Sequence, residues 1–176
     1  AYGQCSVVID LIYGLPGQTM EVWEQDLADL VSSGVDGADL YQLNVFDGSD
    51  LNKDIANGKV PAAATTAMQG DMFKFGRKYL DERSYRRLSA AHWSANNRER
   101  SLYNILAKAG VPMFPFGSGA GGNVDGYGMM LHRALKPYED MVNRGEKPFM
   151  ALMKQSELQP VVNQVVSQLE QGFLNI

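Results

Sequence analysis

The sequence has 176 residues and a formal net charge of −4; 45% of its residues are apolar and 20% are charged. This length and composition predict one domain, or slightly more than one, and exclude a disordered tail, a collagen and a coiled coil. There is no run of about 18 apolar residues, so we expect no membrane-spanning segment. The single cysteine, Cys5, cannot form a disulfide within the chain.

The first part of the sequence predicts a strand, a helix and a second strand. Residues 6–13 are almost continuously apolar and β-branched, which is typical of a strand buried on both faces of a parallel sheet. Glycines and a proline at 14–17 predict a turn. Thr19 suits the N-cap of a helix that should end at Gly34. A second strand at residues 38–45 completes a βαβ unit, whose two strands should be parallel.

The elements expected after this unit are less regular. A polar loop should occupy residues 47–59, and Pro61 suits the first turn of a second helix. Beyond that helix the patterns predict, in chain order, a strand at 85–93, a helix at 101–108, strands at 111–116 and 126–131, and helices at 136–143 and 156–174.

The predicted order indicates an α/β fold that is larger than this chain. A strand buried on both faces needs more covering elements than follow it here, and a complete parallel barrel has about 250 residues. We therefore expect the C-terminal part of a partial (β/α) TIM-like barrel at 1–82, followed by an α+β substrate-binding extension at 83–176. On this interpretation an N-terminal part is missing, and two copies of the chain can pair as a dimer along the exposed first strand.

Asp10 is the first candidate for a functional side chain. A carboxylate inside an apolar strand is costly unless it is hydrogen-bonded. Ligands of α/β sheets bind at the carboxyl ends of the strands, where Asp10 would accept hydrogen bonds from ligand hydroxyls such as those of a ribose. The alternative is that Asp10 caps nearby backbone N–H groups. The spacing alone leaves both open.

Two further features, His92 and the glycine-rich segment 117–122, each have a chemical and a structural interpretation. An imidazole near a strand end can ligate haem iron or relay a proton, but a hydrogen-bonded structural histidine has the same signature. The glycines match the spacing of a phosphate loop, yet a turn and not a helix follows them. We interpret the segment as one kept small so that a flat macrocycle can approach the backbone.

Residues 9–19 (IDLIYGLPGQT) resemble the fifth-strand motif of the radical S-adenosylmethionine enzymes related to oxygen-independent coproporphyrinogen III oxidase. A looser likeness covers the sixth strand of that family at residues 40–46 and later segments at 85–93 and 116–121. The glycine-rich segment, together with Tyr127, most resembles the haem-utilisation branch, whose members are anaerobic haem-degrading methyltransferases. The fold implied is a radical S-adenosylmethionine barrel, of which this chain would hold strands five and six.

The resemblance also implies cofactors and contacts. Family members hold a [4Fe–4S] cluster on a Cys-x3-Cys-x2-Cys loop and use it to reduce S-adenosylmethionine to a 5′-deoxyadenosyl radical. This chain lacks that loop, so we expect no metal site and no activity from the chain alone, with His92 as a candidate contact to haem. The residues implied to bind S-adenosylmethionine are Asp10, through the ribose hydroxyls, and Ile12, Tyr13, Gly14, Phe46, Tyr103 and Gly121. Packing in a core is the alternative for both tyrosines.

The function implied for the full-length protein is anaerobic haem degradation, in which radical methylation of the porphyrin accompanies ring opening. One alternative is oxidative decarboxylation of coproporphyrinogen III, and another is a non-catalytic haem-binding or chaperone module. The expected partners are a tetrapyrrole substrate and an electron donor such as a flavodoxin. A cytoplasmic location is expected, and a sequence this acidic predicts no nucleic-acid partner.

Overall fold

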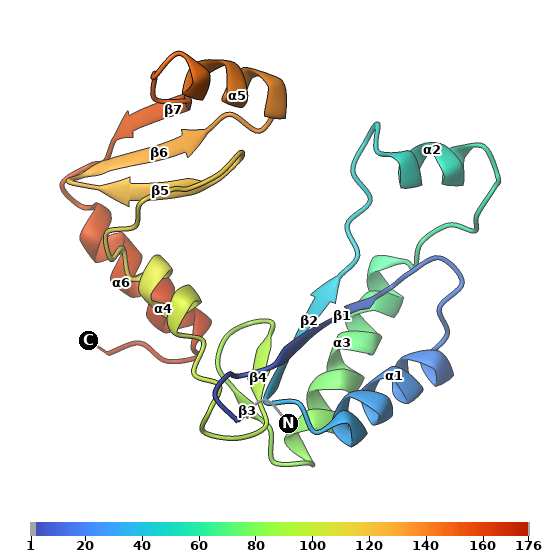
Figure 1. Ribbon diagram of the computed structural model, residues 1–176. Coiled ribbons are helices and arrows are strands. Elements are labelled where there is room, and N and C mark those ends of the chain that lie inside the picture. The colour runs from blue at the N-terminus through green and yellow to red at the C-terminus, as the bar shows by residue number, and fades with distance from the viewer. Residues whose placement is uncertain (1–2, 176) are drawn as a thin grey trace. The chain divides into compact units, whose positions relative to one another are not determined.

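The computed structural model describes residues 3–175, which divide into two units, one ending at Ser101 and the other beginning at Leu102 (Figure 1). The first unit has a four-stranded sheet and the second a three-stranded sheet. The predicted division between residues 82 and 83 falls inside the first unit, because strands after it pair with the first sheet. Substrate binding by the later part of the chain remains a prediction.

The predicted strand–helix–strand unit is present. Strands β1 (Val8–Tyr13) and β2 (Gly37–Gln42) are parallel, and helix α1 (Met20–Ser33) connects them. Thr19 caps α1, since its side chain accepts a backbone hydrogen bond in the first turn, and Gly34 ends the helix in the left-handed conformation. Both predicted helix ends are therefore confirmed.

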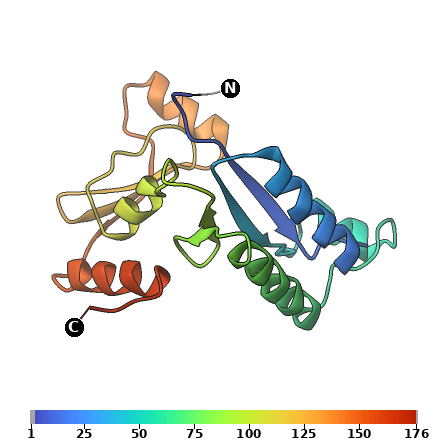
Figure 2. The same cartoon turned by 90° about the horizontal axis from the view of Figure 1, so that it is seen from below.

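One face of the first sheet carries the core. Helices α1 and α3 (Thr66–Asp81) lie side by side against the same face of β1 and β2 (Figures 1 and 2). Trp23 is fully buried between them, and its Nε1 donates a hydrogen bond to the Met72 carbonyl oxygen at 2.8 Å. The buried core comprises Tyr13, Trp23, Leu27, Leu30, Ala38, Leu40, Met72, Leu80 and Trp93.

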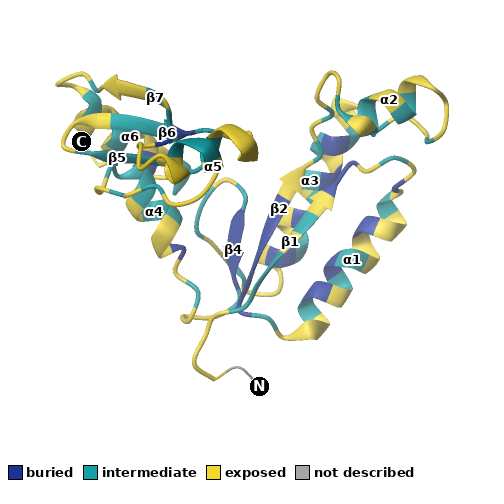
Figure 3. Cartoon of the chain, turned by 45° about the horizontal axis from the view of Figure 1, so that its top comes forward, coloured by how far each residue is buried: buried dark blue, intermediate teal, exposed yellow. Residues whose placement is uncertain are grey.

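The other face of β1 is exposed, which corrects the prediction of a strand buried on both faces (Figure 3). Asp10 is exposed, and Ile12 is 44% exposed. Because successive side chains of a strand point to opposite faces, these two share the face that the helices leave uncovered. We call it the open face of the sheet.

The prediction of a polar loop at residues 47–59 is wrong in part. It contains a short helix, α2 (Asp50–Ala56), whose N-cap Ser49 accepts a backbone hydrogen bond. Helix α3 begins after its N-cap Thr65 and not at Pro61. A hydroxyl that accepts a backbone N–H bond marks a helix start more strongly than a proline does.

The single strand predicted at residues 85–93 is two short strands. β3 (Arg86–Arg87) and β4 (His92–Ser94) pair antiparallel, and β4 also pairs antiparallel with β2. The sheet order is β1-β2-β4-β3. Backbone N–H groups of Leu88 and Ser89 both donate to the His92 carbonyl oxygen, which closes the turn between the two strands.

The second unit combines an antiparallel sheet with helices. Its elements are α4 (Leu102–Lys108), β5 (Gly121–Val124), β6 (Tyr127–Leu131), α5 (Leu135–Asn143), β7 (Phe149–Lys154) and α6 (Gln159–Glu170). The three helices lie where they were predicted, within a few residues. Among residues 3–175, no helix has the length and apolar character needed to cross a bilayer.

The strands of the second unit were predicted less well than its helices. β5 and β7 were missed, because β5 contains two glycines and β7 consists mostly of residues common in helices. The strand predicted at 111–116 is only an isolated bridge between Met113 and Asn123. The proline on each side of Met113 lacks the N–H group that a longer ladder needs.

Candidate functional site

One glutamine fixes the turn after β1. Gly14 and Gly17 have positive φ angles of +85° and +75°, which L side chains rarely adopt. The Oε1 atom of Gln18 accepts hydrogen bonds from the backbone N–H groups of Gly14 at 2.8 Å and Leu15 at 3.2 Å, and its Nε2 donates to the Asp26 carboxylate at 3.1 Å. Gln18 is only 9% exposed, so these internal bonds hold the turn in one shape without help from a ligand.

A second glutamine joins this turn to the end of β2. Gln69 in α3 is 6% exposed; its Nε2 donates to the Leu43 carbonyl oxygen at 3.0 Å, and its Oε1 accepts from Gln42 at 2.7 Å. A Cβ atom at Gly14 would lie 2.6 Å from Gln69 Nε2, so this packing requires glycine. Sequence reasoning missed Gln18 and Gln69. A glutamine within the apolar stripe of a helix was the available signal for Gln69.

Four of the residues predicted to bind the cofactor lie on the open face or at the carboxyl edge of the first sheet. Asp10 and Ile12 share the open face of β1, and Gly14 follows the end of that strand. Phe46 follows the end of β2 and is 72% exposed. Because β1 and β2 are parallel, Gly14 and Phe46 lie beyond the same edge of the sheet, where α/β proteins bind their ligands.

The other three predicted cofactor residues lie elsewhere. Tyr13 points into the core, where it is 6% exposed and its ring centroid lies 5.6 Å from that of Trp23. This is the packing given as its alternative. Tyr103 in α4 is 71% exposed and Gly121 begins β5, so both belong to the second unit.

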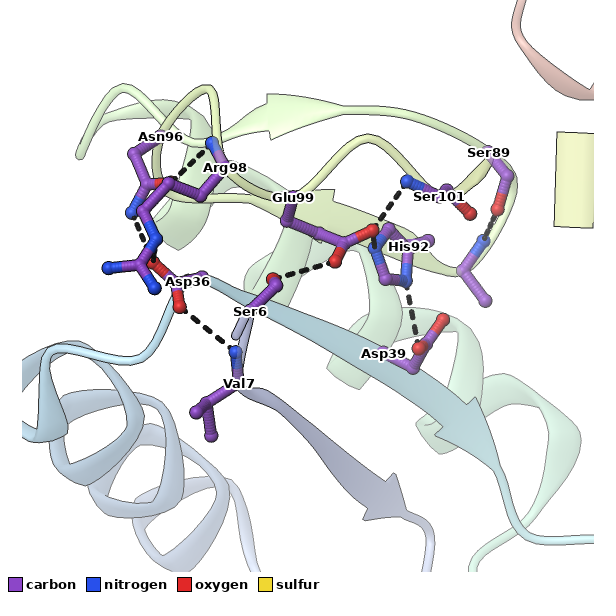
Figure 4. A network of polar contacts seen from close by, with 11 residues as sticks. Ser6, Val7, Asp36, Asp39, Ser89, His92, Asn96, Arg98, Glu99 and Ser101 are labelled. Carbon is purple, nitrogen blue, oxygen red and sulfur yellow. Dashed lines mark hydrogen bonds and ion pairs between the residues drawn. The ribbon is translucent and has the colours of Figure 1, made fainter. Parts of the chain in front are cut away.

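Both ring nitrogens of His92 in β4 face carboxylates (Figure 4). Nδ1 lies 2.8 Å from Asp39 Oδ2, and Nε2 lies 3.3 Å from Glu99 Oε1. The histidine is 4% exposed. Burial opposes the charged form, but the hydrogen bonds and charges of Asp39 and Glu99 outweigh it, so the pKa of His92 is raised above its ordinary value of 6.5.

Glu99 is held in turn by two other groups. The Ser6 hydroxyl donates to Oε2 at 2.8 Å, and the backbone N–H of Ser101 donates to Oε1 (Figure 4). Burial alone would raise the pKa of Glu99, but these bonds and the neighbouring imidazolium lower it overall. The His92 ring therefore lies between two carboxylates, hydrogen-bonded to Asp39 through Nδ1 and ion-paired with Glu99 through Nε2. A haem-iron ligand needs an unprotonated nitrogen, so the geometry favours the hydrogen-bonded alternative for His92.

Within the glycine-rich segment 117–122, the structure shows a close backbone approach at Gly122. A Cβ atom on Gly122 would lie 2.4 Å from the Met113 carbonyl oxygen, so another segment of the chain lies against this backbone. Gly119 has a φ of +76°, and its N–H donates to the His132 carbonyl oxygen at 2.9 Å. The close approach at Gly122 is therefore made by the protein itself, whereas a Cβ atom on Gly117 would meet nothing within 4 Å. The approach of a macrocycle to this segment stays a prediction.

The second unit also has a small apolar cavity of about 180 Å³. Sites that enclose a drug-sized ligand measure about 300–1,000 Å³, so this cavity is too small to enclose a tetrapyrrole. Its lining consists of Phe114, Pro115, Phe116, Met129, Leu131, Tyr138, Val142, Lys147, Pro148 and Phe149.

The residues of this chain do not fit a [4Fe–4S] cluster. Such clusters are held by cysteine thiolates, and the sequence contains one cysteine. Within residues 3–175, no group of three His, Cys, Asp or Glu side chains is arranged to hold a metal ion. The accessible Asp10 carboxylate on the open face instead suits a ligand that carries hydroxyl groups.

Comparison with known proteins defines the class. Coproporphyrinogen III oxidase of Escherichia coli, a radical S-adenosylmethionine enzyme, superposes with a TM-score of 0.75 at 17% identity over 96% of this chain and 41% of that chain. The mitochondrial radical S-adenosyl methionine domain-containing protein 1 of Danio rerio is 30% identical over 118 residues, 66% of this chain and 26% of that protein. No protein-family model matches the sequence. The chain belongs to the radical S-adenosylmethionine enzymes related to coproporphyrinogen III oxidase.

Within this family the chain is similar to anaerobilin synthase of Escherichia coli O157:H7. The two are 40% identical over 154 residues, which make up 88% of this chain and 34% of anaerobilin synthase. The chain thus spans about a third of the length of this relative. The resemblance inferred from residues 9–19 is confirmed, and so is the assignment of the chain to the haem-utilisation branch.

Proposed function

We propose that this chain provides one wall of the S-adenosylmethionine site in an enzyme that degrades haem anaerobically. Radical methylation of the porphyrin would accompany opening of its ring. The observation that supports this proposal is the 40% identity with anaerobilin synthase over 88% of the chain. Oxidative decarboxylation of coproporphyrinogen III has weaker support, because the likeness to coproporphyrinogen III oxidase is one of fold at 17% identity.

The ribose of S-adenosylmethionine is placed at Asp10 in this proposal. The carboxylate is exposed on the open face and can accept hydrogen bonds from two hydroxyl groups. Ile12, on the same face, offers an apolar surface 44% exposed next to it. Charge-assisted hydrogen bonds are about twice as strong as neutral ones, so Asp10 would supply most of the polar affinity.

The adenine is placed beside the Gly14 turn. The Gly14 N–H is already bonded to Gln18, and its carbonyl oxygen accepts from Ala64 N at 3.1 Å. This backbone therefore offers shape and van der Waals contact more than hydrogen bonds. The exposed ring of Phe46 beyond the same edge suits stacking on a base. Tyr103 and Gly121 stay in the proposal as contacts from the second unit.

When bound, S-adenosylmethionine would supply radical chemistry to the full-length enzyme together with a [4Fe–4S] cluster. The residues of this chain do not hold that cluster, so their proposed contribution is to bind and orient the nucleoside. Haem as the substrate, a flavodoxin-like electron donor, a cytoplasmic location and a dimer of this chain complete the proposal. None of these four is needed for the nucleoside site at Asp10.

A chimaera tests the proposal. This chain replaces the matched third of anaerobilin synthase, and the anaerobic loss of haem absorbance is followed with S-adenosylmethionine and a reductant. We expect haem consumption. Asp10→Asn should raise the KM for S-adenosylmethionine about tenfold, as expected for a lost hydrogen bond to a charged group. Asp71→Asn is the matched control, because the Asp71 side chain is 70% exposed and contacts only Lys74 among the ion pairs.

Every other outcome either supports one of the alternative functions or contradicts the proposal. Consumption of coproporphyrinogen III in place of haem would support the decarboxylase. Saturable haem binding without turnover would support a haem-binding module. A chimaera that neither binds nor consumes either tetrapyrrole contradicts the proposed substrate class.

A further inference from the structure

The apolar cavity of the second unit has two exposed aromatic rings in its lining. Phe114 and Phe116 both line the cavity, yet their side chains are 69% and 85% exposed. Their ring centroids lie 6.3 Å apart, and the ring planes are tilted by 35° to each other, so the two rings form one apolar surface. An exposed apolar surface that adjoins a cavity is typical of a ligand-binding site.

Strand β5 fixes the segment that carries these rings. The Met113 N–H donates to the Asn123 carbonyl oxygen at 2.8 Å, and the Met113 carbonyl oxygen accepts from the Asn123 N–H at 3.0 Å. Pro115 lies between the two phenylalanines in the chain and against Gly122, where a Cβ atom would be 2.8 Å from Pro115 Cδ. The segment is therefore held in place before any ligand binds.

Lys147 supplies the charge of this cavity. Of the described residues that line the cavity, Lys147 alone is charged. Its backbone is fixed on both sides, because its carbonyl oxygen accepts from the Phe149 N–H at 2.8 Å and the Pro148 carbonyl oxygen accepts from the His132 N–H at 3.0 Å. The cavity thus combines an apolar lining with one positive charge at a fixed point of the backbone.

The carboxylates close to Lys147 in the chain are paired with other cations. Glu146 accepts two hydrogen bonds from the Arg144 guanidinium, at 3.0 and 2.8 Å, and Asp140 accepts one from Lys136 at 2.5 Å. Within residues 3–175, no carboxylate lies within ion-pair distance of the Lys147 ammonium group. An anionic ligand can therefore pair with this lysine without displacing a carboxylate of the protein.

The space at this site suits one edge of a flat ligand. Gly117 follows Phe116 in the chain with a φ of +93°, and a Cβ atom there would meet nothing within 4 Å. The cavity of about 180 Å³ is smaller than sites that enclose a whole drug-sized ligand. A matching ligand is flat, apolar over most of its surface and carries a carboxylate at the edge that enters the cavity.

We propose that this cavity binds the carboxylate-bearing edge of a tetrapyrrole. Lys147 donates a hydrogen bond to a propionate, and the macrocycle lies on the rings of Phe114 and Phe116. This inference rests on the tetrapyrrole substrate of the proposed function and adds a substrate contact in the second unit. It needs no bond to iron, because an ammonium group has no lone pair and the two phenylalanine rings carry no ligating atom.

The test is a titration of the full 176-residue chain with protoporphyrin IX, an iron-free porphyrin with two propionates, and with its dimethyl ester. Binding is followed by the absorbance of the porphyrin and by nuclear magnetic resonance of the amides in β6 and β7. The unsubstituted chain should bind the diacid about two- to fivefold more tightly than the ester, the range for an exposed ion pair. High salt should reduce this preference.

Lys147→Met tests the charge. It should remove the preference for the diacid and leave the affinity for the ester unchanged. Lys154→Met is the matched control, because Lys154 is exposed in β7 of the same unit but does not line the cavity. The control should keep the full preference for the diacid.

Phe116→Ala tests the apolar surface. It should weaken the binding of diacid and ester equally, by at least about threefold, because the ring contacts the macrocycle of both. Phe173→Ala, at a 52% exposed position outside the cavity, should change neither affinity. The amide spectra without porphyrin show whether each variant is folded.

The outcomes distinguish this inference from the function on which it rests. Equal losses in Lys147→Met and Lys154→Met would overturn the inference, and so would a chain that binds neither porphyrin or binds diacid and ester equally. If the chimaera consumes haem and Lys147→Met leaves its KM for haem unchanged, the inference is overturned while the proposed function stands.

A third probe distinguishes the two candidate substrates, since both carry propionates. Coproporphyrin III has four carboxylates, and its titration is compared with that of protoporphyrin IX. Binding of either porphyrin that Lys147→Met weakens supports the carboxylate contact. Tighter binding of coproporphyrin III assigns the contact to the decarboxylase alternative, and tighter binding of protoporphyrin IX assigns it to haem degradation.

Discussion

The two units of this chain bury their apolar side chains to different extents. The first unit has a core of nine buried residues around Trp23, covered by α1 and α3. Among the described residues of the second unit, Leu131 is the only hydrophobic residue in the buried class. Its helix α6 exposes Val161, Val162, Val165, Val166 and Leu169.

This difference shows where a ligand site can be held in a fixed shape. Gln18, Gln69 and His92 are all buried polar groups of the first unit, and each bonds to groups at or near the predicted cofactor residues. Such bonds are strong only when packing excludes water from them. The exposed Tyr103 of the second unit has no comparable packing.

The largest effect should come from removing the centre of the first core. Trp23→Ala deletes a fully buried indole and its hydrogen bond to Met72, which should lower the free energy of unfolding by about 3–5 kcal/mol. Urea unfolding followed by the fluorescence of Trp93 measures this unit, because both tryptophans of the sequence lie in it. Phe116→Ala, at an 85% exposed position of the second unit, should change the free energy by less than about 0.5 kcal/mol. Equal losses of unfolding free energy in the two variants would contradict the conclusion that the first unit has the better-buried core.

The turn after β1 should be the next most sensitive position. Gly17→Ala places a side chain at a φ of +75° with open space around it, so it should cost about 1–2 kcal/mol of backbone strain alone. Gly14→Ala adds a clash with Gln69, whose Cγ atom would lie 2.7 Å from the new Cβ. Gln69 cannot move away without breaking its bonds to Gln42 and Leu43. The Gly14→Ala variant should therefore unfold at a lower temperature than Gly17→Ala, and the reverse order would contradict this account of the turn.

The His92 network should make the stability of the first unit depend on pH. Because folding raises the pKa of His92, its stabilising contribution is fully present below the unfolded value of 6.5 and is lost as pH rises through the folded pKa. Glu99 acts in the opposite sense: its pKa is lowered, so its contribution is lost as pH falls through that value. Urea unfolding between pH 6 and 9 should show a decline that His92→Gln removes. If the decline in stability persists in the variant, another titratable group causes it.

The sequence predicted the parts of this fold that local chemistry determines. Residues 6–13, Thr19 and Gly34 carry the strand, cap and terminator signals of the βαβ unit, and the structure has each of them. The strand β7 was missed because its residues favour a helix and only the pairing with β6 makes them a strand.

The candidate site was predictable only where one residue carries the signal. Asp10 was found because a carboxylate in an apolar strand is unusual, and Asp39 has the same signal in β2 but was not used. The contact of His92 with Asp39 joins residues 53 positions apart, and it depends on the antiparallel register between β4 and β2. The sequence predicted one longer strand where the structure has β3 and β4, so this register could not be foreseen. Gln69 was missed for the same reason, because its partners Gln42 and Leu43 become its neighbours only after α3 packs on the sheet. The bonds of Gln18 are all local, but a glutamine in a turn carries no signal of its own in the sequence.

The smallest effect should come from the exposed face of α6, and it tests the comparison most directly. Val161→Ser replaces a side chain that is 61% exposed, so the free energy of unfolding of the second unit should change by less than about 0.5 kcal/mol. Since that unit has no tryptophan, its unfolding is followed by hydrogen exchange of the amides in β6. The matched substitution Leu30→Ser in α1, where the side chain is 3% exposed, should instead destabilise its own unit by at least about 2 kcal/mol. A loss at Val161 as large as that at Leu30 would mean that the α6 face is covered in solution, and the second unit would then bury an apolar surface comparable with that of the first.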